Sequence, residues 1–132
     1  GTDYRQRAVD GHARVLTDDE YRSGISAAAS VGIASDDAFA DVIGHLAQVH
    51  PSRYIRLIDG VATVGLRDVT EFDDQSAALR FVAFVDRVYD AQIPVRATGL
   101  SLDGVFPEEM LAGGYRKKYL RAISRLVAST LA

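Results

Sequence analysis

The residues best suited to chemistry lie near the C-terminus. Residues 1–110 carry ten basic and eighteen acidic side chains, a net charge of −8, whereas residues 111–132 carry five basic side chains and no acid. If this segment is a helix, Arg121 and Arg125 lie one turn apart and can reach the same anion. Clustered guanidinium and ammonium groups bind phosphate or acidic partners, so Arg121, Arg125 and Lys118 are candidate phosphate-binding residues.

The same spacing has a structural interpretation. An apolar stripe occupies the other side of the expected helix and includes Tyr119, Ala122 and Leu126. The basic residues would then form a solvated face, as most charge runs do. Arg125 could also pair with Asp86 or Asp90 and hold the helix onto the rest of the domain, and the spacing does not decide between these roles.

Other catalytic patterns are missing. His12, His45 and His50 do not have the spacing of metal ligands, and the chain contains no G-x-S-x-G nucleophile motif. Gly60 and Gly65 match the outer glycines of a phosphate-binding loop, but the Lys and Ser or Thr that should follow are missing. The chain therefore has no Walker A loop of its own, and we expect no metal site.

Asp68 is a further candidate because it follows an expected strand, where α/β proteins often place working carboxylates. With a nearby histidine it could serve a small α/β hydrolase. The structural alternative is a turn or capping residue.

The elements that must position these residues form an α/β fold. A strand near 61–66, a helix over 74–91 and a strand near 93–98 make a βαβ unit, which requires parallel strands and a right-handed crossover. Helices should cover this unit, with a helical N-terminal part and the basic helix at the C-terminus. The smaller elements expected are a strand at 12–16, a helix from a Thr17–Glu20 capping box to about residue 30, a helix capped by Ser35 and ending before Pro51, a short helix between 52 and 60, and a short helix starting at Pro107.

Composition limits the protein class. The 132 residues suit one domain, and 48% hydrophobic with 25% charged residues is ordinary for a globular protein. No apolar run is long enough for a membrane span, and the first residues lack a secretory signal, so the sequence predicts a cytoplasmic location. The absence of cysteine excludes disulfides and thiolate sites.

Three motifs resemble the C-terminal region of ZapE-type cell-division ATPases, which belong to the AAA+ class. The first two are the Arg80-Phe81, Val85-Asp86, Tyr89-Asp90 series and the closing pattern of Tyr119, Arg121, Ser124, Arg125 and Leu126. The third is the opening Asp3-Tyr4-Arg5, which resembles the D-Y-R that follows the ATPase core in this family. The helix departs from the family pattern twice: Ala122 replaces a Thr, and Lys118 stands where an acid is usual, which makes the helix more basic.

The resemblance implies that residues 1–132 form the C-terminal domain of a larger ATPase, with its Walker A and B motifs upstream. ATP and magnesium would bind that core, and this chain alone should be inactive. Arg121 and Arg125 would act as sensor-like or intersubunit residues. Expected partners are the ATPase core of the same polypeptide, a homo-oligomer, and cell-division or protease-client proteins.

A different function remains open. The chain could be a standalone interaction module whose basic C-terminal helix binds an acidic protein or nucleic acid. The net charge of −3 and the absence of Trp make nucleic acid the weaker of these two partners.

Overall fold

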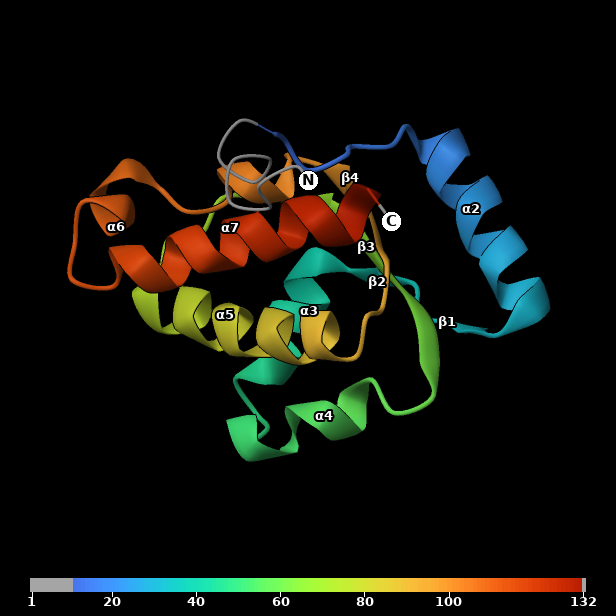
Figure 1. The fold of residues 1–132 in the computed structure, drawn as a ribbon, viewed down its shortest axis with the longest axis horizontal. Helices are drawn as coiled ribbons and strands as arrows, with labels where there is room; N and C mark the ends of the chain where they lie inside the picture. Colours follow the sequence, from blue (N-terminus) through green and yellow to red (C-terminus); the bar gives the residue numbers. More distant parts are fainter. Residues whose placement is uncertain (1–10, 132) are drawn as a thin grey trace, which may run out of the picture.

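The computed structural model describes residues 11–131, and the predicted D-Y-R match at residues 3–5 lies outside them. A parallel four-stranded sheet has helices on both faces (Figure 1). Its central strand is β3 (Val61–Val69). Along one edge of β3 lie β1 (Ile33–Ala34) and β2 (Asp37–Ala38), and β4 (Val95–Gly99) lies along the other edge.

The predicted βαβ unit is confirmed as β3, α5 and β4. Helix α5 (Gln75–Asp90) begins after Asp74, whose carboxylate accepts a hydrogen bond from the Ala77 backbone N–H. It connects two parallel strands, so it lies against one face of the sheet. Strand β3 extends three residues beyond the expected end, and β4 begins two residues later than expected.

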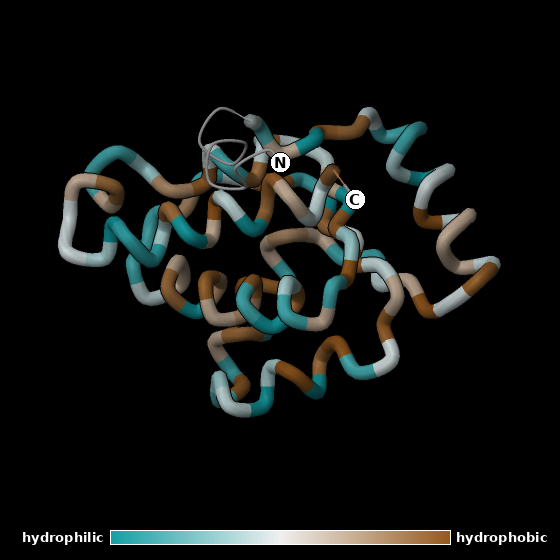
Figure 2. Tube along the Cα trace, in the orientation of Figure 1, coloured by the Kyte–Doolittle hydropathy of each residue, from teal (hydrophilic) through white to brown (hydrophobic). Residues whose placement is uncertain are grey.

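The face of the sheet that carries α5 is apolar. Helices α3 (Phe39–Leu46), α4 (Tyr54–Leu57), α5 and α7 (Arg116–Leu131) pack together there, and α5 and α7 alternate between hydrophobic and hydrophilic residues along their length (Figure 2). Their buried sides meet the inward residues of β3 and β4, including Val64, Leu66 and Val95. Short helices join these elements: η1 (Pro51–Arg53), η2 (Leu102–Gly104) and α6 (Glu108–Leu111).

The opposite face carries one helix, α2 (Asp18–Val31). The predicted capping box is confirmed, because Thr17 Oγ accepts from the Glu20 N–H and the Glu20 carboxylate accepts from the Thr17 N–H. Tyr21 is the one buried residue that α2 contributes. Most of this helix is therefore exposed.

Two predictions for the N-terminal part are wrong. Residues 12–16 do not form a strand; their one backbone bond to the sheet runs from the Leu16 N–H to the Ala97 carbonyl. Asp103 holds this segment by accepting from the Ala13 N–H and pairing with His12. Ser35 does not cap α3 because its own N–H bonds to the Thr63 carbonyl, so sheet pairing replaces capping and the helix starts at Phe39.

No helix within residues 11–131 combines the length and apolar character that crossing a membrane requires.

Candidate functional site

The α7 cations partly neutralise one carboxylate on α5. Arg125 Nη1 lies 2.5 Å from Asp86 Oδ1, and Arg121 Nη2 lies 3.3 Å from Asp86 Oδ2. The Arg125 guanidinium also lies over the Tyr89 ring, 4.9 Å from its centroid. The predicted convergence of Arg121 and Arg125 on one anion is thus observed, with Asp86 as the anion.

Exposure distinguishes the two arginines. The Arg125 side chain is 24% exposed and Asp86 is 18% exposed, whereas Arg121 is 50% exposed. Arg125 therefore has a position typical of a residue that fixes α7 against α5. Arg121 makes the longer contact and keeps half of its surface available to another group.

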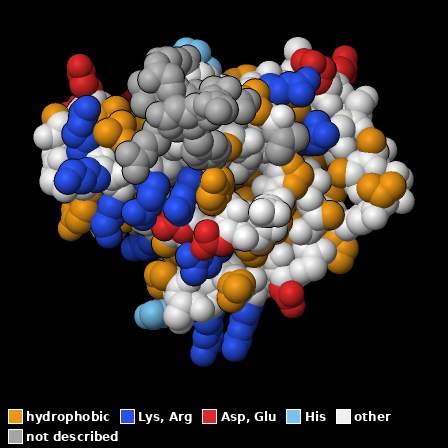
Figure 3. Space-filling model, in the orientation of Figure 1, with side chains coloured by type: hydrophobic (Ala, Val, Ile, Leu, Met, Phe, Trp, Pro, Cys, Tyr) orange, Lys and Arg blue, Asp and Glu red, His pale blue; other side chains and the backbone are white. Residues whose placement is uncertain are grey.

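Further cations lie at the start of α7. Lys117 and Lys118 are exposed, and Lys118 Nζ lies 6.0 Å from the centroid of the Tyr115 ring. Arg116 donates to the Leu111 carbonyl. Lys and Arg side chains gather over α5, α6 and α7, with few acids among them (Figure 3). This part of the surface can attract an anion.

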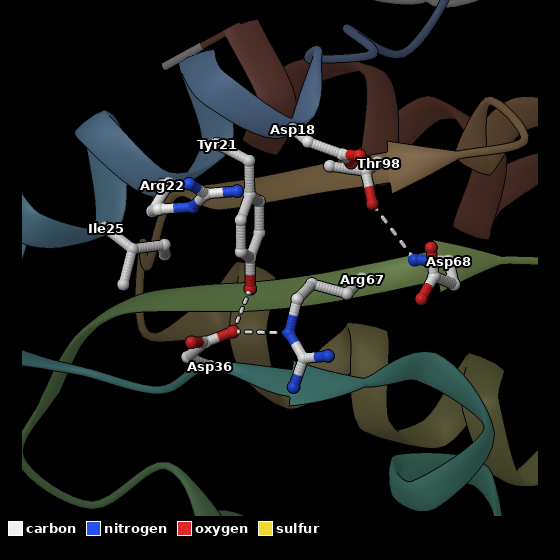
Figure 4. Close-up of a pocket in the computed structure, with 8 residues that line it drawn as sticks. All are labelled: Asp18, Tyr21, Arg22, Ile25, Asp36, Arg67, Asp68 and Thr98. Atoms are coloured by element: carbon white, nitrogen blue, oxygen red, sulfur yellow. Dashed lines mark hydrogen bonds and ion pairs between the residues drawn. The ribbon is translucent and has the colours of Figure 1, made fainter.

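A second polar site lies at the carboxyl ends of β3 and β4, under α2. We call this cavity of about 260 Å³ the carboxyl-edge cavity (Figure 4). Parallel α/β sheets bind ligands at this end of their strands. The cavity is lined by Asp18, Tyr21, Arg22, Ile25, Asp36, Arg67, Asp68 and Thr98.

Three of these side chains form a hydrogen-bonded network. The Tyr21 hydroxyl and Arg67 Nε each donate to Asp36 Oδ1 over 2.7 Å. The bonds from Arg67 and then Tyr21 hold the pKa of Asp36 below its usual range. Burial, reinforced by Asp36, raises the pKa of Tyr21. Tyr21 thus stays a neutral donor while Asp36 stays ionised.

A β-bulge sets the position of Asp68. Between Leu66 and Val69 the pairing with β4 shifts, and Asp68 adopts a left-handed φ of 58°. Its backbone N–H donates to Thr98 Oγ1 over 3.0 Å, and its carboxylate is exposed at the cavity. Bulges and left-handed residues often occur beside functional sites.

The hydrolase hypothesis lacks its second residue in this arrangement. Within residues 11–131, no histidine lines the carboxyl-edge cavity. His12 pairs with Asp103, His50 caps η1 and His45 lies on α3. No group of three or more metal-ligating side chains occurs in the described part of the chain.

Sequence reasoning missed Tyr21, Asp36 and Arg67. Tyr21 lies on α2, Asp36 in the connection between β1 and β2, and Arg67 on β3, so no local spacing connects them. Gly65 is the only local signal: a Cβ at this position would clash with the Tyr21 hydroxyl and lie 2.7 Å from the Ser35 carbonyl oxygen. Glycine in the middle of a strand often indicates such a close approach.

Comparison with known families decides the identity of the chain. Residues 16–131 match the family of AFG1-like ATPases. The chain belongs to this family. The match covers both polar sites, and it confirms the ZapE-type family predicted from the sequence. No curated protein and no solved structure matches this AFG1-like chain.

Proposed function

We propose that this chain is the non-catalytic C-terminal domain of a larger ZapE-like P-loop ATPase, acting in cell division or protein quality control. The observation that carries the proposal is the AFG1-like ATPase match over residues 16–131 in a sequence without a Walker A loop. ATP and magnesium bind the core of the parent protein in this proposal. The domain contributes nucleotide sensing, an oligomer contact or partner docking.

Within this proposal, Arg121 and Lys118 are the cations that reach out from the domain. Both are exposed on α7, and Arg121 can exchange its 3.3 Å contact with Asp86 for a phosphate or a carboxylate. Arg125 remains against Asp86 and Tyr89 and holds the helix in position. Arg125 is then a positioning residue, and Arg121 is the residue that contacts the anion.

The test measures ATP turnover of the full-length parent. Arg121→Ala and Lys118→Ala should each lower kcat by about tenfold or more, because a lost cation no longer stabilises phosphate charge. The matched control is Arg87→Ala, which removes an exposed arginine paired with Asp90 on α5 and should leave turnover unchanged. Unchanged turnover in both α7 variants would exclude the nucleotide-sensing role.

Arg125→Ala separates positioning from sensing. A lower Tm with ATP turnover close to the wild-type value is expected for a positioning residue. A loss of turnover at an unchanged Tm would instead assign phosphate contact to Arg125.

A standalone interaction module is the second candidate. It is favoured by Tyr115 and Leu120, two exposed apolar residues beside Lys117 and Lys118. Such a surface fits an acidic protein segment with apolar side chains. Salt-sensitive binding of an acidic peptide that disappears in Lys117→Glu/Lys118→Glu would support this function, and preferential binding of DNA or RNA would indicate nucleic acid instead.

A further inference from the structure

A second cavity opens at the edge of the sheet formed by β1 and β2. It has a volume of about 360 Å³ and lies between this edge, α3 and α4; we call it the edge pocket. Its floor consists of buried apolar side chains that belong to the core: Leu46, Ile58, Val64, Leu66 and Phe84. The polar residues that line it are Ser35, Asp37, Asp41 and His45.

The distribution of polar groups indicates the kind of occupant. Asp37, Asp41 and His45 are exposed and lie at the mouth, whereas the floor offers no polar side chain. A small molecule enclosed by a specific site usually meets a few convergent polar groups inside it. An apolar floor with a polar rim instead suits one apolar side chain inserted from a partner surface.

The charged side chains at the mouth indicate the chemistry of the partner. Within residues 11–131, neither the Asp37 nor the Asp41 carboxylate has a hydrogen bond or an ion pair, so both are available. His45 lies one helical turn after Asp41 on α3. The two carboxylates at this mouth favour a partner with a Lys or Arg next to its apolar side chain.

Two exposed apolar residues precede the pocket lining in the chain. Ile33 on β1 is 62% exposed, and Val31 at the end of α2 is 88% exposed. Both precede Ser35 in the chain and lead to the same sheet edge. This edge of the sheet therefore exposes apolar side chains outside the pocket as well.

From these features we propose that the edge pocket binds a partner-protein segment with a Leu or Phe anchor followed by Lys or Arg. The anchor fills the apolar floor, and the cation pairs with Asp37 and Asp41. This inference goes beyond the proposed ATPase role, because it involves neither α7 nor nucleotide.

The experiment titrates the chain with three short capped peptides and follows backbone amide NMR signals. The probes are acetyl-Leu-Arg-Arg-amide, acetyl-Ala-Arg-Arg-amide, which lacks the anchor, and acetyl-Leu-Glu-Glu-amide, which reverses the charge. The Leu-Arg peptide should shift signals of Val42, His45 and Leu66 and bind on the order of fivefold more tightly than either of the others. Absence of binding by all three at about 10 mM, or shifts elsewhere, would overturn the proposal.

Variants of the pocket test the site of the apolar anchor and the two carboxylates separately. Asp37→Asn/Asp41→Asn should weaken the Leu-Arg peptide on the order of fivefold, whereas Asp73→Asn, an exposed aspartate before α5, should not. Val42→Trp should fill the mouth and abolish binding, because Val42 is half-buried in the pocket lining. Unchanged affinity in both pocket variants at wild-type Tm would refute the site.

A further titration tests whether the pocket instead binds a free small molecule that combines an apolar group with a cation. We expect 4-phenylbutylamine to bind more weakly than the Leu-Arg peptide. Tight binding of this amine without peptide binding would show that the pocket accepts a free hydrophobic amine, and it would overturn the partner-protein proposal.

Discussion

The two faces of the sheet differ in composition and in covering. On one face, β3 and β4 direct Val64, Leu66, Val95 and Ala97 into a core built with α3, α5 and α7. On the other, the same strands present Thr63, Gly65, Arg67, Arg96 and Thr98, and α2 covers them while burying Tyr21 alone. A strand alternates its side chains between faces, so one sequence supplies both surfaces.

This difference between the faces assigns stability to the apolar face and recognition to the polar face. Phe81 lies at the centre of the apolar face, 0% exposed, with ring centroids 5.4 Å from those of Phe39 and Phe72. The polar face instead has an open cavity, a bulge and a short hydrogen-bonded network. We infer that the apolar face provides most of the folding free energy and that the polar face can change its contacts at little cost.

The largest expected effect is on the apolar face. Phe81→Ala should lower the free energy of unfolding by about 3–5 kcal/mol, because it leaves a cavity among packed aromatic rings. Ile25→Ala, half-buried at the carboxyl-edge cavity, should lower it by about 1 kcal/mol. Urea unfolding monitored by circular dichroism measures both, and equal losses would contradict the division between the faces.

A smaller effect is expected where α2 approaches β3. Gly65→Ala should destabilise by about 1–3 kcal/mol, because its Cβ would press on the Tyr21 hydroxyl and on the rigid Ser35 carbonyl. Gly44→Ala is the control: this glycine lies inside α3 with open space around it, so alanine should stabilise by up to about 1 kcal/mol. Chemical denaturation of both variants checks the opposite signs, and destabilisation by both would show a general intolerance of alanine.

The apolar face contains one polar group that its packing does not satisfy. The Tyr119 hydroxyl is buried without a hydrogen-bond partner among the described residues, so Tyr119→Phe should stabilise by about 1 kcal/mol. Tyr54→Phe is the matched control and should destabilise, because the Tyr54 hydroxyl donates to the buried Leu46 carbonyl over 2.8 Å. Thermal unfolding compares them, and a lower Tm for both would mean that the Tyr119 hydroxyl has a partner.

The smallest effect concerns pH on the polar face. Because Arg67 and Tyr21 lower the pKa of Asp36 in the folded state, its ionised form stabilises the protein above the unfolded pKa of about 4. This contribution is lost as the pH falls through the folded pKa, and it should stay below about 1 kcal/mol because Asp36 and Arg67 are nearly half exposed. Asp36→Asn should therefore destabilise more at pH 7 than at pH 3 in urea titrations. An equal loss of stability at both pH values would show that the charge of Asp36 does not contribute to the free energy of unfolding.

Local patterns predicted the elements that bury a continuous apolar stripe. Helix α5, the Thr17–Glu20 capping box and the two long strands follow from spacing and capping chemistry within a few residues. The failures at residues 12–16 and at Ser35 both depend on contacts with residues distant in sequence. Residues 12–16 make one backbone bond to Ala97 and are held by the Asp103 side chain instead of a strand ladder, whereas the Ser35 backbone pairs with Thr63 on β3.

The sequence by itself determined the charged face of α7, the βαβ unit and the family, because these depend on residue order along one segment. Only the tertiary structure decided that Arg121 and Arg125 meet Asp86, 35 and 39 residues away. It also decided that Tyr21, Asp36 and Arg67 converge beside Asp68, and that Asp37 and Asp41 surround an apolar pocket. These contacts depend on the pairing of strands and the packing of helices distant in sequence, and local periodicity carries no information about them.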